Sequence, residues 1–564
     1  MDDVDAVQAQ IARNMLETGD WITARLNGIA YLEKSPLVYW TMAACFRLLG
    51  VRDWAARLPL ALAVILLCWV TYKFGSWAFG ERAGIYAGVA LSTSLGLFLF
   101  TRILIPDAML TLTITLAIWA WVRLLEPENE PSFQWQFTLG ISLGLGLLLK
   151  GLVAVVFPVA SALVYMAASN RLFSGEAWRR LRLEIVTAIA LAIAAPWHLM
   201  ASLANPPHFA LSMHSGPGEY RGFFWFYFLN EHLLRFLNLR YPRDYNTVPR
   251  LWFWLLNLVW LFPWSAYLVA APRLNYRPDE RAGRVRLMAL CWTGVVMVFF
   301  TFSTMQEYYS MPIYPALALL VGSSMISGVR QLRAANRLLF WAFCGLGAAL
   351  TLTLGLVAGI HPQGDISRAL TQHPELYTFS LGHLRDLTLE AFAYLKLPLL
   401  LAALAAAVSA VGLGLASGHR ARSAFAVAAG MILFFHSARL ALVRFDPYLS
   451  SYPLAEALEK APSGRLIEAN AYYAFSSVFF YAHRTALLWN GRKDNLEYGS
   501  YAPGAPRVFI DDQKFSALWQ EPYRSYLLTY GSELPHLRQL VGASNLYVVE
   551  TSAGNYLLTN LPLP

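Results

Sequence analysis

Charged side chains are scarce in this sequence. Of its 564 residues only 14% are Asp, Glu, Lys or Arg, whereas 57% are hydrophobic. A soluble globular domain carries roughly 25% charged and about 45–50% apolar residues, so the composition excludes an ordinary soluble enzyme. It also excludes a disordered chain, which combines low hydrophobicity with high net charge. Much of the sequence is therefore expected to cross a lipid bilayer.

Cysteine is also rare, and the signatures of several protein classes are missing. The four cysteines form no CxxC pair, so neither a disulfide framework nor a zinc ribbon is indicated. The sequence contains no GxxxxGK[ST] and no GxGxxG, the loops that bind nucleotide phosphates. No repeat relates the two halves of the chain, which counts against a transporter built from inverted repeats.

Long apolar runs are what the sequence has in abundance. A helix needs roughly 20 apolar residues to cross the hydrocarbon core, and about 12 stretches of that kind occur. The sequence therefore predicts a polytopic α-helical membrane protein. The predicted spans lie near 57–79, 84–100, 106–125, 136–150, 151–168, 183–202, 251–271, 285–303, 310–327, 338–360, 393–416 and 423–443.

Arginine gathers in alternate loops between these predicted spans. Four short loops are dense in arginine, whereas the long gaps 203–250 and 361–392 are not. Loops rich in Lys and Arg stay in the cytoplasm. We therefore expect segment 1–56, the 203–250 loop and everything after about 445 to lie on the opposite face. The formal net charge of +9 then has two expected uses. Basic residues on the cytoplasmic face fix the topology, and basic residues on the other face bind an anionic substrate.

Residues 446–564 differ in composition from the rest. Apolar runs shorten to strand length at 465–467, 507–510, 545–549 and 556–558, and helix-like stretches alternate with them. This pattern predicts a small soluble α/β domain after the last span. The expected organisation is a first extracytoplasmic loop at 1–56, a membrane domain at 57–445 and an α/β domain at 446–564.

Carboxylates concentrate at the predicted outer boundary of the membrane. Asp2, Asp3 and Asp5 precede a helical stretch, and Asp107 stands at the mouth of a span close to Arg102. Each carboxylate could be only an N-terminal helix cap. An ionisable pair at a membrane boundary is nevertheless a functional hypothesis by default. Carboxylates in such a place suit a general base that removes a hydroxyl proton.

Basic and phenolic groups accompany these carboxylates. Lys34 precedes an aromatic-rich run at 38–56 and could be a snorkelling lysine. Glu231 and Arg235 are spaced as a helix-surface ion pair, and His232 alone is a weak metal signal. Arginine, lysine and tyrosine suit a phosphate that leaves with growing negative charge. A lipid-phosphate donor therefore fits this face better than a nucleotide donor.

Several stretches resemble the integral-membrane glycosyltransferases of the GT-C superfamily. The resemblance is to the branch that contains lipid A aminoarabinose transferase (ArnT) and the protein mannosyltransferases of glycosyltransferase family 39. Its most specific parts are 15–21 (MLETGDW) and 31–37 (YLEKSPL). It covers about residues 2–325, and the rest agrees in layout only. Further similar stretches are 57–59, 102–107, 149–151, 195–198, 231–235 and 309–312.

The resemblance implies an inverting transfer of a sugar from a polyprenyl phosphate to a lipid or glycan acceptor at the periplasmic face of the bacterial inner membrane. Expected partners are this donor, the acceptor and membrane lipids, without nucleic acid. The implied catalytic carboxylates are Asp3, Asp5 and Asp107, and the implied donor-phosphate residues are Lys34, Arg57, Arg102, Lys150 and Tyr309. Glu231, His232 and Arg235 are expected to bind the acceptor or to support the site structurally. Glu33 and His232 are candidate ligands of a divalent metal ion, the only cofactor suggested.

The sequence departs from the family pattern in its first loop. Counting back from Met15, the family's first-loop aspartate falls on Val4, which leaves both Asp3 and Asp5 as candidates, Asp3 first. Relatives also have a membrane helix before this motif. The family layout therefore predicts a thirteenth span upstream of Met1.

Other functions compete with this prediction. A protein O-mannosyltransferase would use a polyprenyl-phosphate mannose donor and a Ser or Thr acceptor. A lipid or glycan transporter would place charges at mid-bilayer and show repeat symmetry. An assembly protein would use the C-terminal domain for docking and would leave Asp107, Lys34 and Arg102 without a purpose. The charges gathered at one face favour the lipid-phosphate glycosyltransferase.

Overall fold

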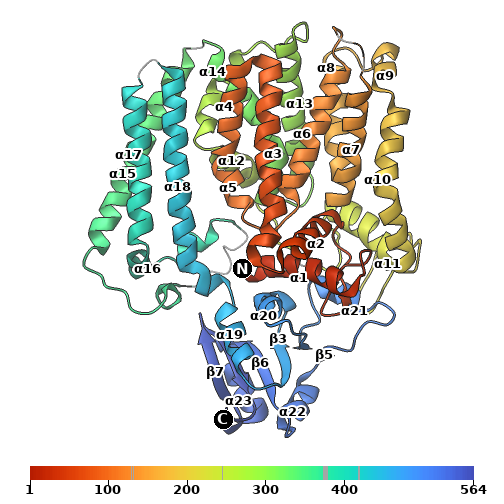
Figure 1. The fold of residues 1–564 in the computed structure, drawn as a ribbon, viewed down its shortest axis with the longest axis vertical. Helices are drawn as coiled ribbons and strands as arrows, with labels where there is room; N and C mark the ends of the chain where they lie inside the picture. The colour runs from red at the N-terminus through yellow and green to blue at the C-terminus, as the bar shows by residue number, and fades with distance from the viewer. Residues whose placement is uncertain are drawn as a thin grey trace.

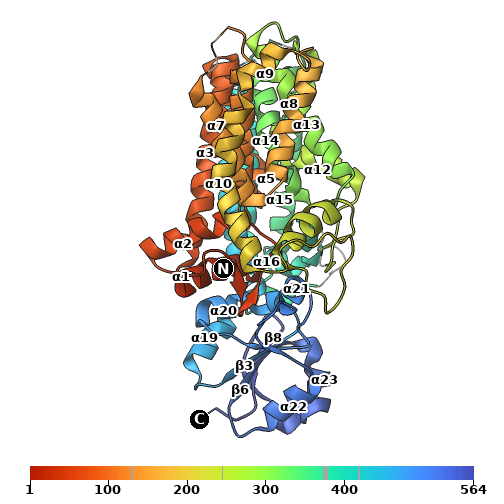
Figure 2. The ribbon, with the colours of Figure 1, turned by 90° about the vertical axis from the view of Figure 1, so that its right-hand side faces the viewer.

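The computed structural model of the chain is a tall bundle of helices with a small sheet domain at one end (Figures 1 and 2). The N-terminal helices α1 (Asp3–Thr18) and α2 (Leu37–Leu49) lie across that same end, between the bundle and the sheet. The chain thus begins beside the domain in which it finishes. The structure describes residues 1–128, 130, 132–243, 245–328, 330–371, 379–416 and 419–563.

Eight of the predicted spans coincide with helices long and apolar enough to cross a membrane, counted among the described residues. A ninth, 251–271, is a broken pair: α12 (Arg250–Trp260) and η2 (Trp264–Arg273) are bent by 103°. The eight are α3 (Asp53–Phe79), α6 (Asp107–Leu124), the α9–α10 pair (Gly175–Leu181 and Leu183–Ala204), α13 (Arg281–Thr301), the η3–α14 pair (Glu307–Ile313 and Tyr314–Ile326), α15 (Gln331–Val357), α17 (Lys396–Leu415) and α18 (Arg420–Leu449).

The other three predicted spans are also helical but shorter or more polar. The stretch 84–100 is divided into α4 (Glu81–Ser92) and α5 (Leu95–Phe100). The stretch 136–150 is α7 (Phe133–Lys150), which holds two glutamines and a lysine, and 151–168 is α8 (Val153–Ala168), of only 16 residues. Among described residues, spans of full length therefore number eight or nine instead of about 12.

The loops at the sheet end of the bundle contain short helices. The 203–250 loop forms α11 (Gly222–Phe224) and the π-helix η1 (Trp225–Leu234), and the first loop forms the hairpin β1 (Arg25–Leu26) and β2 (Ile29–Ala30). The predicted loop 361–392 lies partly outside the described residues, as does Pro564. Its described part contains η4 (Ile366–Ala369), η6 (Gly382–Asp386) and the start of α16 (Leu389–Tyr394).

The C-terminal domain is a six-stranded sheet of order β5-β4-β3-β6-β8-β7. Strands β5 to β6 of this order are parallel, and β8 and β7 are antiparallel at one edge. This arrangement confirms the predicted α/β fold class. The strands are β3 (Arg465–Ala469), β4 (Leu487–Trp489), β5 (Phe509–Ile510), β6 (Ser525–Tyr530), β7 (Tyr547–Ser552) and β8 (Asn555–Thr559); the helices are α19 (Tyr452–Lys460), η7 (Tyr472–Phe475), α20 (Ser476–Ala482), α21 (Asn495–Ser500), α22 (Asp512–Gln520), η8 (Gly531–Glu533), α23 (Leu534–Val541) and η9 (Ala543–Asn545).

Helix α1 joins this domain to the bundle through buried polar contacts. Gln10 Nε2 donates to the Ser476 carbonyl at 2.9 Å, and Arg13 Nη1 donates to the Phe480 carbonyl at 2.8 Å. In the turn of the first-loop hairpin, Asn27 Nδ2 donates to the Ala486 carbonyl at 2.8 Å. Buried polar groups are stable only when they are hydrogen-bonded. These contacts therefore fix α1 and the hairpin against the C-terminal domain.

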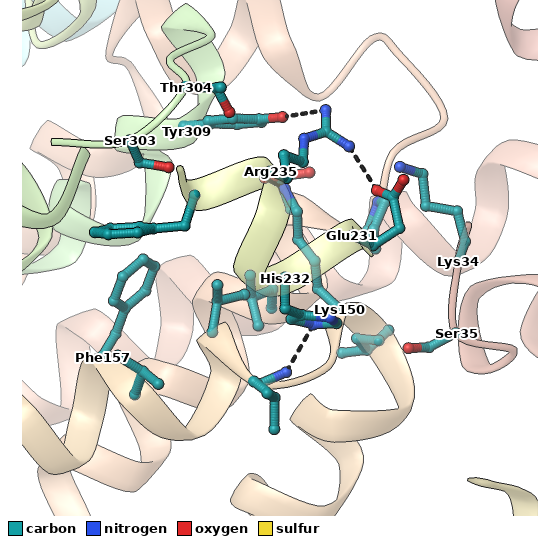
Figure 3. A pocket seen from close by; sticks show the side chains of 18 of the residues that line it. Lys34, Ser35, Lys150, Phe157, Glu231, His232, Arg235, Ser303, Thr304 and Tyr309 are labelled. Carbon is teal, nitrogen blue, oxygen red and sulfur yellow. Dashed lines mark hydrogen bonds and ion pairs between the residues drawn. The ribbon is translucent and has the colours of Figure 1, made fainter. Parts of the chain in front are cut away.

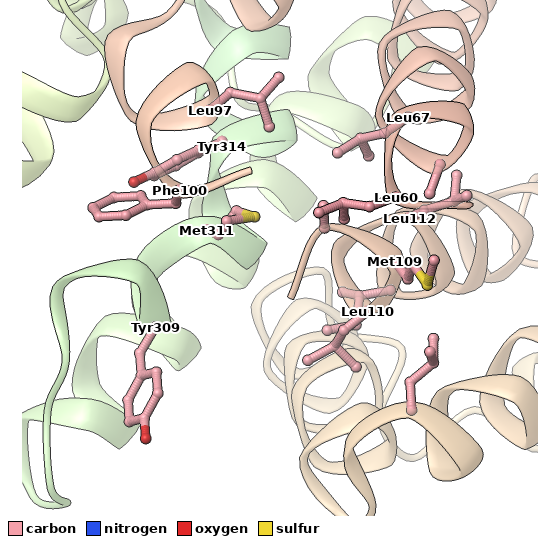
Figure 4. Close-up of a cluster of buried hydrophobic side chains, with 14 of the residues drawn as sticks. Leu60, Leu67, Leu97, Phe100, Met109, Leu110, Leu112, Tyr309, Met311 and Tyr314 are labelled. Carbon is pink, nitrogen blue, oxygen red and sulfur yellow. The ribbon is translucent and has the colours of Figure 1, made fainter. Parts of the chain in front are cut away.

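The centre of the bundle is a continuous apolar cluster in which α3, α5, α6 and η3 meet (Figure 4). Leu60, Phe100, Leu110 and Met311 are buried in it. Tyr309 extends from η3 with its hydroxyl pointing away from this cluster. The same packed elements that form the core therefore also carry a polar group to its border.

Close packing of α3 against α4 depends on Gly84. A Cβ atom at this position would lie 2.5 Å from the Tyr72 carbonyl oxygen and 2.6 Å from the Ser76 nitrogen. Small residues where helices cross are typical of membrane bundles, because they let backbones approach closely. The turn between these helices can therefore stay tight only without a side chain here.

We expect Gly84→Ala to lower the free energy of unfolding by about 1–3 kcal/mol, the usual effect of overpacking. Gly345→Ala on α15 is the matched control, because a Cβ there meets nothing within 4 Å. The measurement is thermal unfolding of the purified chain in detergent. Equal melting temperatures for the two variants would show that the contact of α3 with α4 tolerates a methyl group.

Candidate active site

A cavity of about 360 Å³ lies at the sheet end of the bundle. One side of it is apolar, with Val153, Val156 and Phe157 of α8 facing Phe299 and Phe300 of α13. The other side is rich in ionisable groups (Figure 3). Its lining includes eight of the candidate residues: Glu33, Lys34, Asp107, Lys150, Glu231, His232, Arg235 and Tyr309.

Asp107 and Lys150 form an ion pair at the border of this cavity. Lys150 Nζ donates to Asp107 Oδ1 at 2.6 Å, and the Asp107 side chain is 2% exposed. Asp107 begins α6 and Lys150 ends α7, so each charge also complements a helix dipole. The ammonium lies over the rings of Tyr309 and Tyr308, 4.7 and 5.5 Å from their centroids. Lys150 is thus held between a carboxylate and two aromatic faces.

Glu231, Arg235 and Tyr309 form a second group, shown in line in Figure 3. Arg235 Nη1 lies 2.7 Å from Glu231 Oε2, and Arg235 Nη2 donates to the Tyr309 hydroxyl at 2.9 Å. Burial alone would raise the pKa of Glu231, but Arg240, with Arg235 and Lys34, lowers it to about 2. Glu231 is therefore a carboxylate at neutral pH. Arg235, which pairs with it, also lines the cavity.

His232 is fully engaged by the backbone. Its Nδ1 lies 2.6 Å from the Tyr227 carbonyl, and its Nε2 accepts from the Leu152 N–H at 3.0 Å. This pairing requires the neutral tautomer with the proton on Nδ1, and burial lowers the pKa of the ring. The imidazole therefore orients η1 against the turn between α7 and α8.

The predicted metal ligands do not fit a metal ion. Both nitrogens of His232 are hydrogen-bonded to backbone. Glu33 accepts from the Tyr31 hydroxyl at 3.2 Å and from Arg240 Nη2 at 2.8 Å. Among the described residues no group of three or more His, Cys, Asp or Glu side chains could hold a metal ion. The arrangement provides ion pairs where a metal site needs free ligands.

Asp5, Arg57 and Arg102 lie together beside the cavity but not in its lining. Asp5 is buried, pairs with Arg57 and accepts from the Leu104 N–H at 2.7 Å. Arg57 also donates to the Arg102 carbonyl. Burial raises the pKa of Asp5 to about 6. This group therefore shapes the loop that leads into Asp107, whereas the Arg102 guanidinium is not among the cavity groups.

Asp3 lies apart from all of these. Its carboxylate accepts from the Ser477 N–H at 2.7 Å and from the Ser451 hydroxyl at 3.0 Å, both in the C-terminal domain. Burial raises its pKa to about 7. Asp3 does not line the cavity. The structure thus separates the first-choice carboxylate of the sequence from Asp107 and places it at a domain interface.

Sequence reasoning did not single out several groups at the site. Ser303 and Thr304 line the cavity, and Arg240 bridges Glu33 and Glu231 from behind. Nothing in the sequence distinguishes Arg240 from the other arginines of the 203–250 loop. Its role is visible only when that loop is folded against the first loop.

The known proteins that this chain resembles are sugar transferases. Residues 33–199 match the family described as dolichyl-phosphate-mannose-protein mannosyltransferase. The undecaprenyl phosphate-alpha-4-amino-4-deoxy-L-arabinose arabinosyl transferase of Pectobacterium carotovorum is 28% identical over 359 residues, 61% of this chain and 59% of that protein. Transferase 1 of that name from Pseudomonas fluorescens is 26% identical over 424 residues, 71% of this chain and 68% of that protein. The chain thus spans about three fifths of the length of the first of these relatives.

The crystal structure of ArnT from Cupriavidus metallidurans bound to undecaprenyl phosphate has the same fold. Its TM-score is 0.77 at 21% identity, covering 99% of this chain and 93% of that one. The chain therefore has the GT-C glycosyltransferase fold, as the sequence predicted. Within that class its sequence is similar to the aminoarabinosyl transferases named above.

The buried Asp3 predicts a pH dependence of stability. Because burial raises its pKa from 3.8 to about 7, the folded state binds a proton more tightly than the unfolded state. The free energy of unfolding therefore falls as pH rises from about 4 to 7. Asp3→Asn keeps the hydrogen bonds without the charge. We expect its stability advantage over the unsubstituted chain to be larger at pH 8 than at pH 5 by about 1–3 kcal/mol.

Thermal unfolding at the two pH values measures this difference. Asp279→Asn is the control, because Asp279 is an exposed carboxylate on a loop. An Asp3→Asn advantage that does not change with pH would show that Asp3 is ionised in the folded chain.

Proposed function

We propose that this chain transfers a sugar from a polyprenyl phosphate donor to a hydroxyl group of an acceptor. The observation that carries the proposal is the cavity itself. Its lining combines an apolar wall with a group of cations and includes the buried carboxylate Asp107. A lipid phosphate has the same two parts, an apolar chain and an anionic head group.

Each side of the cavity would bind a different part of the donor. The apolar residues of α8 and α13 would hold the first part of the prenyl chain, which gains free energy by leaving water. Lys34, Arg235 and Lys150 would bind the phosphate, with the Tyr309 hydroxyl as a further donor. Charge-assisted hydrogen bonds of this type are the strong ones. The likeness to the ArnT structure that holds undecaprenyl phosphate supports this donor class.

The Asp107–Lys150 pair links donor binding to base catalysis. A donor phosphate competes with Asp107 for the Lys150 ammonium and leaves the carboxylate able to accept a proton. Asp107 then takes the acceptor's hydroxyl proton while the hydroxyl oxygen attacks the anomeric carbon. The bond between that carbon and the phosphate oxygen breaks, and the phosphate leaves with the bonding electrons. The cations stabilise the charge on the leaving group, and the configuration at the anomeric carbon inverts.

We further propose lipid A or a related lipid or glycan as the acceptor, at the periplasmic face of the bacterial inner membrane. The relatives' names specify an undecaprenyl-phosphate aminoarabinose donor, and the acceptor follows from the resemblance of the sequence to the lipid A aminoarabinose transferase branch. The concentration of arginine in alternate loops, which is typical of cytoplasmic loops, supports this location. A second candidate is protein O-mannosylation, because residues 33–199 match a protein mannosyltransferase family.

An acceptor assay separates the two candidates. Membranes that contain the chain are supplied with undecaprenyl phosphate carrying a labelled sugar, and products are divided into lipid and protein fractions. We expect the label in the lipid fraction and none above background in the protein fraction. Label in protein Ser or Thr would replace the lipid acceptor by the second candidate.

Asp107→Asn tests the proposed base. We expect the transfer rate to fall by about 10²–10⁴, the usual contribution of a general base, while the donor binds at least as tightly because Lys150 is released. Asp3→Asn is the matched control and should retain transfer, since Asp3 does not line the cavity. The measurements are single-turnover transfer and donor binding. Retained transfer in Asp107→Asn would contradict this mechanism.

A further inference from the structure

Arg240 lies behind the candidate active site instead of in it. Its side chain is 1% exposed and is not part of the cavity lining. Nη2 lies 2.8 Å from Glu33 Oε1, and Nε contacts Glu231 Oε1. Nη1 donates to the Pro242 carbonyl at 2.7 Å. One guanidinium therefore holds two carboxylates that both face the cavity on their other side.

The backbone around Arg240 is fixed from two directions. The Tyr241 N–H donates to Asn230 Oδ1 at 3.0 Å, and Asn230 Nδ2 donates to the Tyr241 carbonyl at 2.5 Å. The Tyr241 hydroxyl donates to Glu497 Oε1 on α21 at 2.5 Å. Helix η1 and the C-terminal domain thus both hold the residue next to Arg240. A side chain anchored in this way has little rotamer freedom left to lose on binding its partners.

The charges of the cavity lining balance without Arg240. The described lining contains three cations, Lys34, Lys150 and Arg235, and three carboxylates, which are Glu33, Asp107 and Glu231. A phosphate in such a place needs an excess of positive charge, because an uncompensated anion is costly to remove from water. Arg240 supplies that excess from the side remote from the cavity.

We propose that Arg240 is a positioning residue for the donor phosphate. By neutralising Glu33 and Glu231 from behind, it leaves Lys34 and Arg235 able to bind phosphate instead of saturating carboxylates. Arg240 itself does not touch the donor. This inference rests on the proposed function, because it assigns a role in binding the same lipid phosphate.

The test compares Arg240→Gln with a charge-restoring double variant. We expect Arg240→Gln to raise the donor KM about tenfold or more, with kcat within about threefold, because it removes the charge behind the phosphate site. Glu33→Gln combined with Arg240→Gln removes one negative charge in compensation. We expect the donor KM of this pair to return to within about threefold of the unsubstituted chain, which loss of packing alone would not allow.

Arg221→Gln is the matched control. Arg221 pairs with Glu219 at 2.7 Å in the same loop but does not line the cavity, so its removal should leave the donor KM unchanged. Direct binding of undecaprenyl phosphate to the detergent-purified chain gives a second readout. Absence of transfer by the unsubstituted chain would defeat the proposed function, whereas this inference would still be decided by the binding readout.

Two results would overturn the inference. One is an Arg240→Gln donor affinity equal to that of Arg221→Gln. The other is a double variant that binds donor as weakly as Arg240→Gln alone. If Arg240→Gln does not fold, the double variant is compared with Glu33→Gln. A donor affinity of the double variant at least tenfold below that of Glu33→Gln would then show that Arg240 acts otherwise than through the Glu33 charge.

Discussion

The cost of burying an unpaired charge governs the arrangement of this site. Moving an isolated ion out of water costs several kcal/mol of solvation free energy. A buried carboxylate therefore persists as an anion only beside a cation. Asp107 has Lys150, and Glu231 has Arg235 and Arg240. These pairs join α6 to α7 and η1 to the rest of the 203–250 loop, and Arg240 also pairs with Glu33 of the first loop. The groups that assemble the cavity are therefore also the groups available for chemistry. Under the proposed function, a donor phosphate would enter by exchanging partners with them.

The sequence predicted where helices form better than how they end. Apolar runs place the helices correctly because burial in lipid or protein requires little more than hydrophobicity and length. The break between α4 and α5 was missed because it depends on Thr93 and Ser94, whose hydroxyls donate to the Val89 and Leu91 carbonyls. Strands β4 and β6 were also missed. Strand β4 lies between two parallel neighbours, and β6 lies between parallel β3 and antiparallel β8. Burial on two faces in the interior of a sheet removes the alternation that marks a strand.

The sequence predicted those site residues that can be identified from their chemical type and their position along the chain. Charged groups at a membrane boundary drew attention to Lys34, Asp107 and Glu231, and the structure places all three around one cavity. Asp3 could not be placed in the same way, because its partner Ser477 is 474 positions away. Arg240 was overlooked for the same reason: its partners are tertiary. Residue type indicates what a side chain can do, and only the fold shows which neighbours it serves.

The C-terminal domain supports the site without contributing to its lining. Among the described lining residues none lies beyond α14. The domain nevertheless contacts α1, through Gln10 and Arg13, and α1 carries Asp5, which fixes the loop before Asp107. It also holds Tyr241, the neighbour of Arg240, through Glu497. Both supports of the cavity, one behind Asp107, the proposed base, and one behind the cations proposed to bind phosphate, therefore end in this domain. Rigid placement of charges needs an outer layer of this kind, because a charged group misplaced by about 1 Å loses much of its effect.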